Sequence, residues 1–273
     1  MSAHFLVLTD FTPDADRALE YADALAVPMG ASIVLLHIRR ESLLDPDAFT
    51  GKIQHMSEGE VAAALAQRAA TVQVPIEVES TVEGITEGVR EAVARHRSAL
   101  VILGKPETED TPDELVASTS LKLLRATQVP LLVVPIGTTA TMPPARITLA
   151  ADGQAFRLAE PVIVSVQKLL QRLQPALTVV HVAEPEENDD PGIALATVLH
   201  SGLGTEFPAI NTCGVRHRTP SRGILQAGHE TQADLLVLVA RRRSFLGQLF
   251  NRSVSAQVIL HSELPVLLLP ATE

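Results

Sequence analysis

The chain has 273 residues, of which 46% are apolar, and a formal net charge of -10 at neutral pH. This length and apolar share suit two globular domains, each with its own core. The negative charge disfavours nucleic acid and anionic membranes as partners, because affinity for phosphate groups comes from Lys and Arg.

The sequence also lacks the patterns of a membrane span, a signal peptide and an internal disulfide. No apolar run approaches the roughly 20 residues of a membrane span, and Asp10 interrupts the first apolar run, unlike in a signal peptide. We therefore expect a cytoplasmic protein that does not bind membranes. Cys213 is the single cysteine, so an internal disulfide is excluded.

The first half alternates apolar runs with helix-period segments. Residues 5–8 and 33–37 are typical of strands covered on both faces, and a helix is predicted between them. Thr12 is expected to cap that helix with its hydroxyl, and Pro13 suits its first position. The remaining predicted elements are helices at 58–70, 86–95 and 119–126 and strands at 76–80, 100–103 and 131–134. This alternation implies right-handed crossovers and a parallel sheet with helices on both faces.

The second half repeats the first at offsets of 135–144 residues. The matched pairs are HFLVLTD (4–10) with RITLAAD (146–152), SIVLLHI (32–38) with LTVVHV (177–182), LVILG (100–104) with LLVLV (235–239), and PLLVVP (130–135) with PVLLLP (265–270). One folding unit is therefore duplicated and fused. Gly, Thr and Pro without periodicity mark the boundary, so we predict domains at 1–137 and 146–273 with a linker at 138–145.

Several of these segments resemble the universal stress protein family: the TDF segment after the first strand, the LLHI and VVHV strand ends, and the LVILG loop that leads to STS. The resemblance implies an α/β fold, flavodoxin-like or adenine nucleotide alpha hydrolase-like. It implies two tandem five-stranded parallel sheets of order 3-2-1-4-5 with helices on both faces. The family uses the fifth strand for dimerisation. Since both fifth strands here are apolar edges, we expect an internal pseudo-dimer, and a further homodimer is open.

ATP-binding members of this family carry Gly, two residues, Gly, nine residues, Gly, then Ser or Thr, after strand four. Glycines let the backbone approach phosphates, and the hydroxyl caps a helix whose N–H groups hold the anion. The carboxylate after strand one contacts adenine or ribose in those members, which implies this role for Asp10 and Asp152, with a purely structural turn as the alternative. In an open parallel sheet, these positions lie at the carboxyl ends of the strands, where ligands bind.

The first half departs from the ATP pattern. Only Gly104 survives, with Glu107 and Ala117 at the other glycine positions, while Ser118 matches the hydroxyl. The loop is also acidic, and a like-charge pair at about 4 Å costs roughly 4 kcal/mol at a dielectric near 20, before screening. Its carboxylates are Glu107, Glu109, Asp110, Asp113 and Glu114. We expect weak or absent ATP binding in this half, with a bridging divalent cation as the alternative.

The second half departs in the opposite direction, because Val239, Arg242 and Arg252 stand at the glycine positions. With Arg241 and Arg243, these arginines surround Ser253, which is expected to cap a helix, and their forked donors could hold an anion. The alternative is a solvated basic face, or arginines paired with carboxylates of the first half or of a partner chain. We interpret His37 and His181 as core histidines with one satisfied nitrogen.

These considerations give one set of candidate ligand-binding residues: Asp10, Gly104, Ser118, Ser120, Asp152, Arg242, Arg243, Arg252, Ser253 and Ser255. The sequence contains none of the common hydrolase, Walker or zinc motifs, so we predict no catalytic or metal-binding residues. We expect either no cofactor or an adenine nucleotide such as ATP. By resemblance, we expect a non-enzymatic stress-response scaffold or sensor with a protein or small-ligand partner. A slow ATPase, or a binder of another phosphorylated metabolite at the arginine-rich loop, is the alternative.

Overall fold

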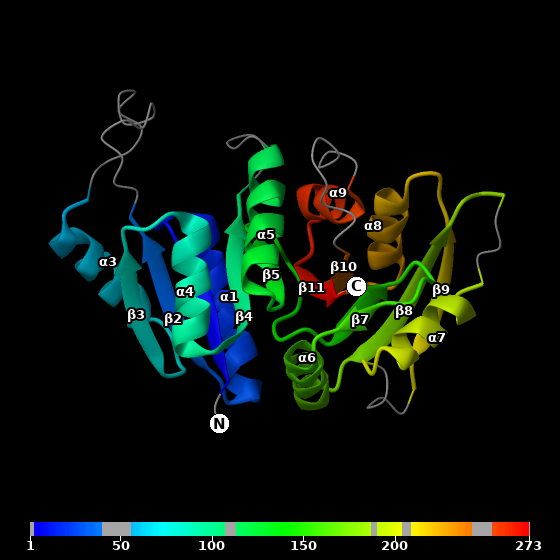
Figure 1. Cartoon of the computed structure of the whole chain (residues 1–273), viewed down its shortest axis with the longest axis horizontal. Helices are drawn as coiled ribbons and strands as arrows, with labels where there is room; N and C mark the ends of the chain where they lie inside the picture. Colours follow the sequence, from blue (N-terminus) through cyan, green and yellow to red (C-terminus); the bar gives the residue numbers. More distant parts are fainter. Residues whose placement is uncertain are drawn as a thin grey trace.

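The computed structural model describes residues 3–39, 56–106, 113–186, 190–203, 209–241 and 253–272. Each half alternates strands and helices, as its apolar periodicity predicts (Figure 1). The first half contains β1 (His4–Thr9), α1 (Pro13–Met29), β2 (Ser32–Ile38), α3 (Glu58–Ala69), β3 (Ile76–Thr81), α4 (Ile85–His96), β4 (Ser98–Lys105), α5 (Asp113–Thr127) and β5 (Leu131–Pro135). The second half contains β6 (Arg146–Ala150), β7 (Arg157–Leu158), α6 (Glu160–Leu173), β8 (Ala176–Ala183), α7 (Gly192–His200), β9 (Asn211–Arg216), α8 (Pro220–Glu230), β10 (Leu235–Ala240), α9 (Val254–His261) and β11 (Val266–Thr272).

The strands of both halves form one continuous sheet of order β3-β2-β1-β4-β5-β11-β10-β6-β8-β9. Each half keeps the order 3-2-1-4-5, but the prediction of two separate sheets is corrected. The fifth strands pair with each other in antiparallel fashion, with Leu132 opposite Leu267 and Leu131 opposite Leu268. An exposed apolar edge invites pairing with another strand, and here each fifth strand covers the other.

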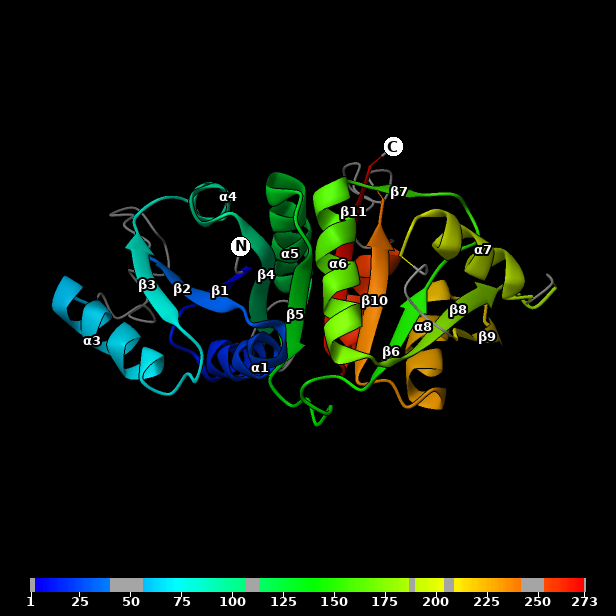
Figure 2. The ribbon, with the colours of Figure 1, turned by 90° about the horizontal axis from the view of Figure 1, so that it is seen from below.

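Helices cover both faces of this sheet in two apolar layers. One layer contains buried side chains of α1, α3, α6 and α7, and the other contains those of α4, α5, α8 and α9. Both layers cross the boundary between the halves, where α5 contacts α9 and α1 contacts α6 (Figures 1 and 2). The two halves therefore share their core instead of touching through a polar surface.

The segment between β5 and β6 is held by hydrogen bonds near both of its ends. The Arg17 guanidinium of α1 donates to the Thr138 carbonyl at 2.9 Å. The buried Asp234 carboxylate accepts the backbone N–H groups of Ala145 at 3.1 Å and Arg146 at 2.9 Å. Burial tends to raise the pKa of Asp234, but the hydrogen bonds from Arg146 and Ala145 hold that pKa below its usual value.

One short element of the second half has no counterpart among the predicted elements. Strand β7 lies between β6 and α6 and pairs with β11, whereas α7 follows β8 as the predicted helix at 58–70 follows the second strand of the first half. A two-residue strand is too short for its alternation to stand out, so only its partner strand reveals it. Among the described residues, no helix combines the length and apolar character needed to cross a bilayer.

Candidate functional site

The fold places the candidate residues at the carboxyl ends of the strands. In each half the strand order reverses between strands one and four, which is where ligands bind to open parallel sheets. Asp10 follows β1 and Gly104 lies in β4, while Asp152 follows β6 and Arg241 follows β10. Each half therefore has its own candidate crevice.

The aspartates after strand one both form local turns. Asp10 accepts the Thr12 backbone N–H at 3.2 Å and also accepts the Thr12 hydroxyl, while Asp152 accepts the Gln154 N–H at 3.1 Å. The Thr12 hydroxyl is therefore engaged by Asp10 and makes no capping bond to α1, contrary to expectation, although Pro13 does begin that helix. Asp side chains commonly bond to the backbone two residues on.

The backbone turns in the same way after both aspartates. Phe11 has φ 68° and Gly153 has φ 75°, both in the left-handed region. Glycine adopts this region without steric cost, whereas a side chain costs about 1–2 kcal/mol there. The shared turn supports duplication of one unit, and the first half tolerates a strained residue in it.

The two histidines at the ends of strand two lie in matching positions. His37 donates from Nδ1 to the Thr9 carbonyl at 2.8 Å, and His181 does the same to the Ala151 carbonyl at 3.3 Å. Both side chains are half-buried, and Phe11 stacks on His37 with ring centroids 4.2 Å apart. One bonded nitrogen agrees with the prediction of structural histidines, although neither lies deep in the core.

Gly104 is held against α1. A Cβ atom at this position would lie 2.3 Å from the Asp14 carbonyl oxygen and 2.8 Å from the Ala15 nitrogen. The missing side chain thus allows the first turn of α1 to approach β4. Burial raises the pKa of the Asp14 carboxyl, and the neighbouring carboxylates of Asp10 and Asp16 raise it further against the lowering effect of the Thr12 hydrogen bond. Asp16 is in turn paired with the Arg68 guanidinium, so Asp10 and Asp14 supply the negative charge at this end of the sheet.

The serines of the first half do not lie at a helix start. We predicted a helix at 119–126 capped by Ser118, but α5 begins at Asp113, so Ser118 and Ser120 lie inside it. The fully buried Ser120 hydroxyl donates to the Val116 carbonyl at 2.8 Å. The prediction was wrong because the family spacing was given more weight than the helix-favouring residues before Ser118. The side chains of Glu107, Glu109, Asp110, Asp113 and Glu114 lie outside the described residues.

The second half does have a capped helix start. Ser253 precedes α9, and its hydroxyl oxygen accepts the Ala256 N–H at 3.5 Å, so the predicted cap is confirmed. Ser255 is buried within the same helix. The three other candidates, Arg242, Arg243 and Arg252, lie outside the described residues.

Arg241 joins Asp152 in a contact that the sequence analysis missed. The Arg241 guanidinium donates to the Asp152 carboxylate at 2.7 Å, and to the Gln154 side chain at 2.9 Å and carbonyl at 2.7 Å. Residues that follow adjacent parallel strands are neighbours, so the strand order contained the signal. This pair places a cation and a carboxylate together at the mouth of the second-half crevice.

The different positions of the two serines predict different effects of their removal. Ser253→Ala deletes a helix cap and is expected to lower the free energy of unfolding by about 1 kcal/mol. Ser118→Ala removes no cap and is expected to cost less than half as much. Urea unfolding of the two variants measures the difference, and equal losses would contradict the assignment of α5.

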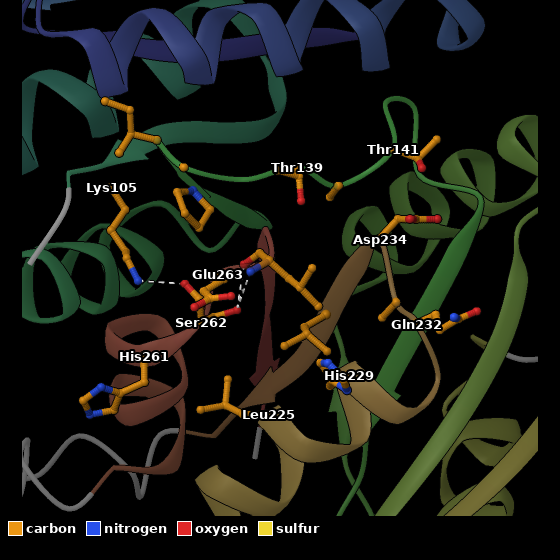
Figure 3. A pocket seen from close by; sticks show the side chains of 18 of the residues that line it. Lys105, Thr139, Thr141, Leu225, His229, Gln232, Asp234, His261, Ser262 and Glu263 are labelled. Carbon is orange, nitrogen blue, oxygen red and sulfur yellow. Dashed lines mark hydrogen bonds between the residues drawn. The ribbon is translucent and has the colours of Figure 1, made fainter.

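A groove of about 1040 Å³ lies between the halves (Figure 3). It is lined by the end of β4, the connection after β5, helix α8 and the end of α9. None of the seven candidate residues that the structure describes lines this groove. Among the described residues, no group of three or more His, Cys, Asp or Glu could hold a metal ion.

The comparisons with known proteins agree with the duplicated fold. A model of the universal stress protein family matches residues 1–135 and 145–270. A universal stress protein from Archaeoglobus fulgidus DSM 4304 is 19% identical over 99% of both chains, with a TM-score of 0.71. A putative universal stress protein from Pseudomonas aeruginosa UCBPP-PA14 is 15% identical over 99% of this chain and 94% of its own, with a TM-score of 0.59. At these identities the likeness shows a shared fold, and no curated protein matches the chain.

Proposed function

Because the chain belongs to the universal stress protein family, matching its model in both halves, we propose that it is a non-enzymatic tandem member. It acts as a stress-response scaffold or sensor that works through protein contacts or a small ligand. Its first half binds ATP weakly or not at all. A ligand, where one binds, is an anion such as an adenine nucleotide, and it binds to the second half.

The position of α5 carries the proposal for the first half. A helix start holds phosphate through free backbone N–H groups, and here that start is Asp113, not a serine. Gly104, the surviving glycine, is engaged in packing against α1. Asp16 is paired with Arg68, but the carboxylates of Asp10 and Asp14 are close enough to influence each other, so a triphosphate here would meet their negative charge.

The second half offers the opposite charge. Its last helix starts at a capping serine, and Arg241 lies at the end of the neighbouring strand β10. A guanidinium binds phosphate oxygens through paired N–H donors. A phosphorylated metabolite other than a nucleotide would meet the same groups. On binding, the Arg241 guanidinium would donate some of its N–H groups to the ligand in place of Asp152.

Thermal unfolding with ATP, AMP or inorganic phosphate tests this assignment. A ligand at about 100 times its Kd stabilises the folded state by about 2.7 kcal/mol, which raises Tm. We expect any such rise to be lost in Arg241→Ala and kept in Ser118→Ala. Arg222→Ala, which removes the same charge from an exposed position on α8, is the matched control. A rise lost in Ser118→Ala but kept in Arg241→Ala would refute the proposal.

Turnover assays address the enzymatic alternative. We expect ATP with magnesium to be hydrolysed no faster in the presence of the protein than in buffer. Metal-dependent hydrolysis that disappears in Asp10→Asn or Asp152→Asn would instead establish a slow ATPase, and the non-enzymatic assignment would be withdrawn.

A further inference from the structure

Lys105 extends from the first half into the second. It is the last residue of β4 and directly follows Gly104, and it is only 8% exposed. Its ammonium group donates to the carbonyls of Ile259 at 2.9 Å, Leu260 at 2.7 Å and Ser262 at 2.8 Å. Figure 3 shows the Lys105 side chain directed at this end of α9.

These carbonyls lie at the C-terminal end of α9. The last four carbonyls of any α-helix have no intrahelical donor, and they form the negative end of the helix dipole. An ammonium group has three N–H donors, so it can make all three of these bonds. Hydrogen bonds to a charged group contribute more to stability than neutral ones.

The matching helix of the first half is capped differently. Helix α5 is followed by Gln128, whose backbone N–H donates to the Leu124 carbonyl at 3.0 Å and whose side chain donates to the Arg125 carbonyl at 2.7 Å. Thr127 adds a bond to the Leu123 carbonyl at 2.9 Å. Helix α5 is thus capped by its own residues.

The second half has no lysine at the position that matches Lys105. In the repeat, LVILG is matched by LLVLV, so the residue that corresponds to Lys105 is Ala240. Alanine has no donor that could reach the end of α5. The contact between the halves is therefore one-sided: the first half caps a helix of the second.

We infer that Lys105 is a latch that makes the order of α9 depend on the folded first half. Opening of the first half withdraws the ammonium group from the end of α9, and this short helix then loses its capping cation and opens as well. This role of Lys105 does not involve ligand binding, so its test is independent of the proposed function.

Hydrogen exchange of the full chain tests the latch through Lys105→Met. This change keeps much of the apolar stem and removes the charge. We expect the α9 amides to exchange at least about tenfold faster, as loss of these bonds implies, while the α8 amides change less than about twofold. Lys122→Met, at an exposed position of α5, is the matched control and is expected to leave α9 unchanged. Unchanged α9 exchange in Lys105→Met, or equal acceleration of α8 and α9, would overturn the inference.

Exchange of the unaltered chain in low urea gives a second test that does not depend on the variant folding. If α9 opens with the first half, the urea dependence and rate of exchange of its amides must match those of the β4 amides and differ from those of the α8 amides of its own half, because α9 and β4 then open in the same event. A shallow dependence for α9 alone would show local fraying and would refute the latch.

Discussion

Gly104→Ala is expected to lower the free energy of unfolding by about 3 kcal/mol, because the added methyl would overlap the first turn of α1. The new Cβ would lie 2.3 Å from the Asp14 carbonyl oxygen, and backbone cannot move aside as a flexible side chain can. Urea unfolding measures the loss. If Gly104 were needed only for phosphate binding, its replacement would weaken ligand binding and leave the free energy of unfolding nearly unchanged.

Gly59→Ala is the matched control for Gly104. Gly59 lies within α3, and a Cβ there would meet nothing within 4 Å. Alanine favours helix over glycine, so this variant is expected to gain about 0.5–1 kcal/mol. Similar stability for the two variants would show that Gly104 is not needed for packing.

Leu268→Ala is expected to destabilise both halves together by about 3 kcal/mol. Leu268 is fully buried in β11 and lies opposite Leu131 across the joint between the halves. Loss of a buried leucine costs about 2–5 kcal/mol through lost contacts and the cavity left behind. Because the sheet and both apolar layers are continuous, we expect a single unfolding transition.

The chain contains a convenient probe for this prediction. It has one tyrosine and no tryptophan, and Tyr21 is buried in α1 of the first half. In Leu268→Ala, we expect the unfolding transition followed by Tyr21 fluorescence to move to lower urea concentration. The transition followed by circular dichroism should move with it, although the substitution is in the second half. Leu199→Ala, at a position 43% exposed, is the control and should shift neither signal much. A Tyr21 transition that stays in place would show that the halves unfold independently.

Much of the fold could be predicted because local patterns determine it. The apolar runs at 5–8 and 33–37 became β1 and β2, and the proline signal placed the start of α1 at Pro13. The repeat and the apolar fifth strands indicated that the halves meet through β5 and β11. The sequence alone did not show that this meeting produces one continuous sheet, because strand pairing between distant segments leaves no local signature.

The candidate site was harder to predict, for three physical reasons. Ser118 was assigned from a spacing, whereas the start of α5 depends on the residues from Asp113 onward. The contact between Arg241 and Asp152 joins segments 89 positions apart, and only the strand order brings them together. Lys105 is bonded to carbonyls more than 150 residues away, and backbone acceptors carry no mark in the sequence.

The central claim is that Gly104 and Lys105, at the end of β4, serve the packing of the fused halves and not phosphate binding. A crystal structure of the full chain grown with magnesium and ATP tests it most directly. We expect no nucleotide at Gly104 and Ser118, with Lys105 still bonded to the end of α9, and any bound nucleotide beside Arg241. An ATP molecule with its phosphates against α5 of the first half would contradict the account.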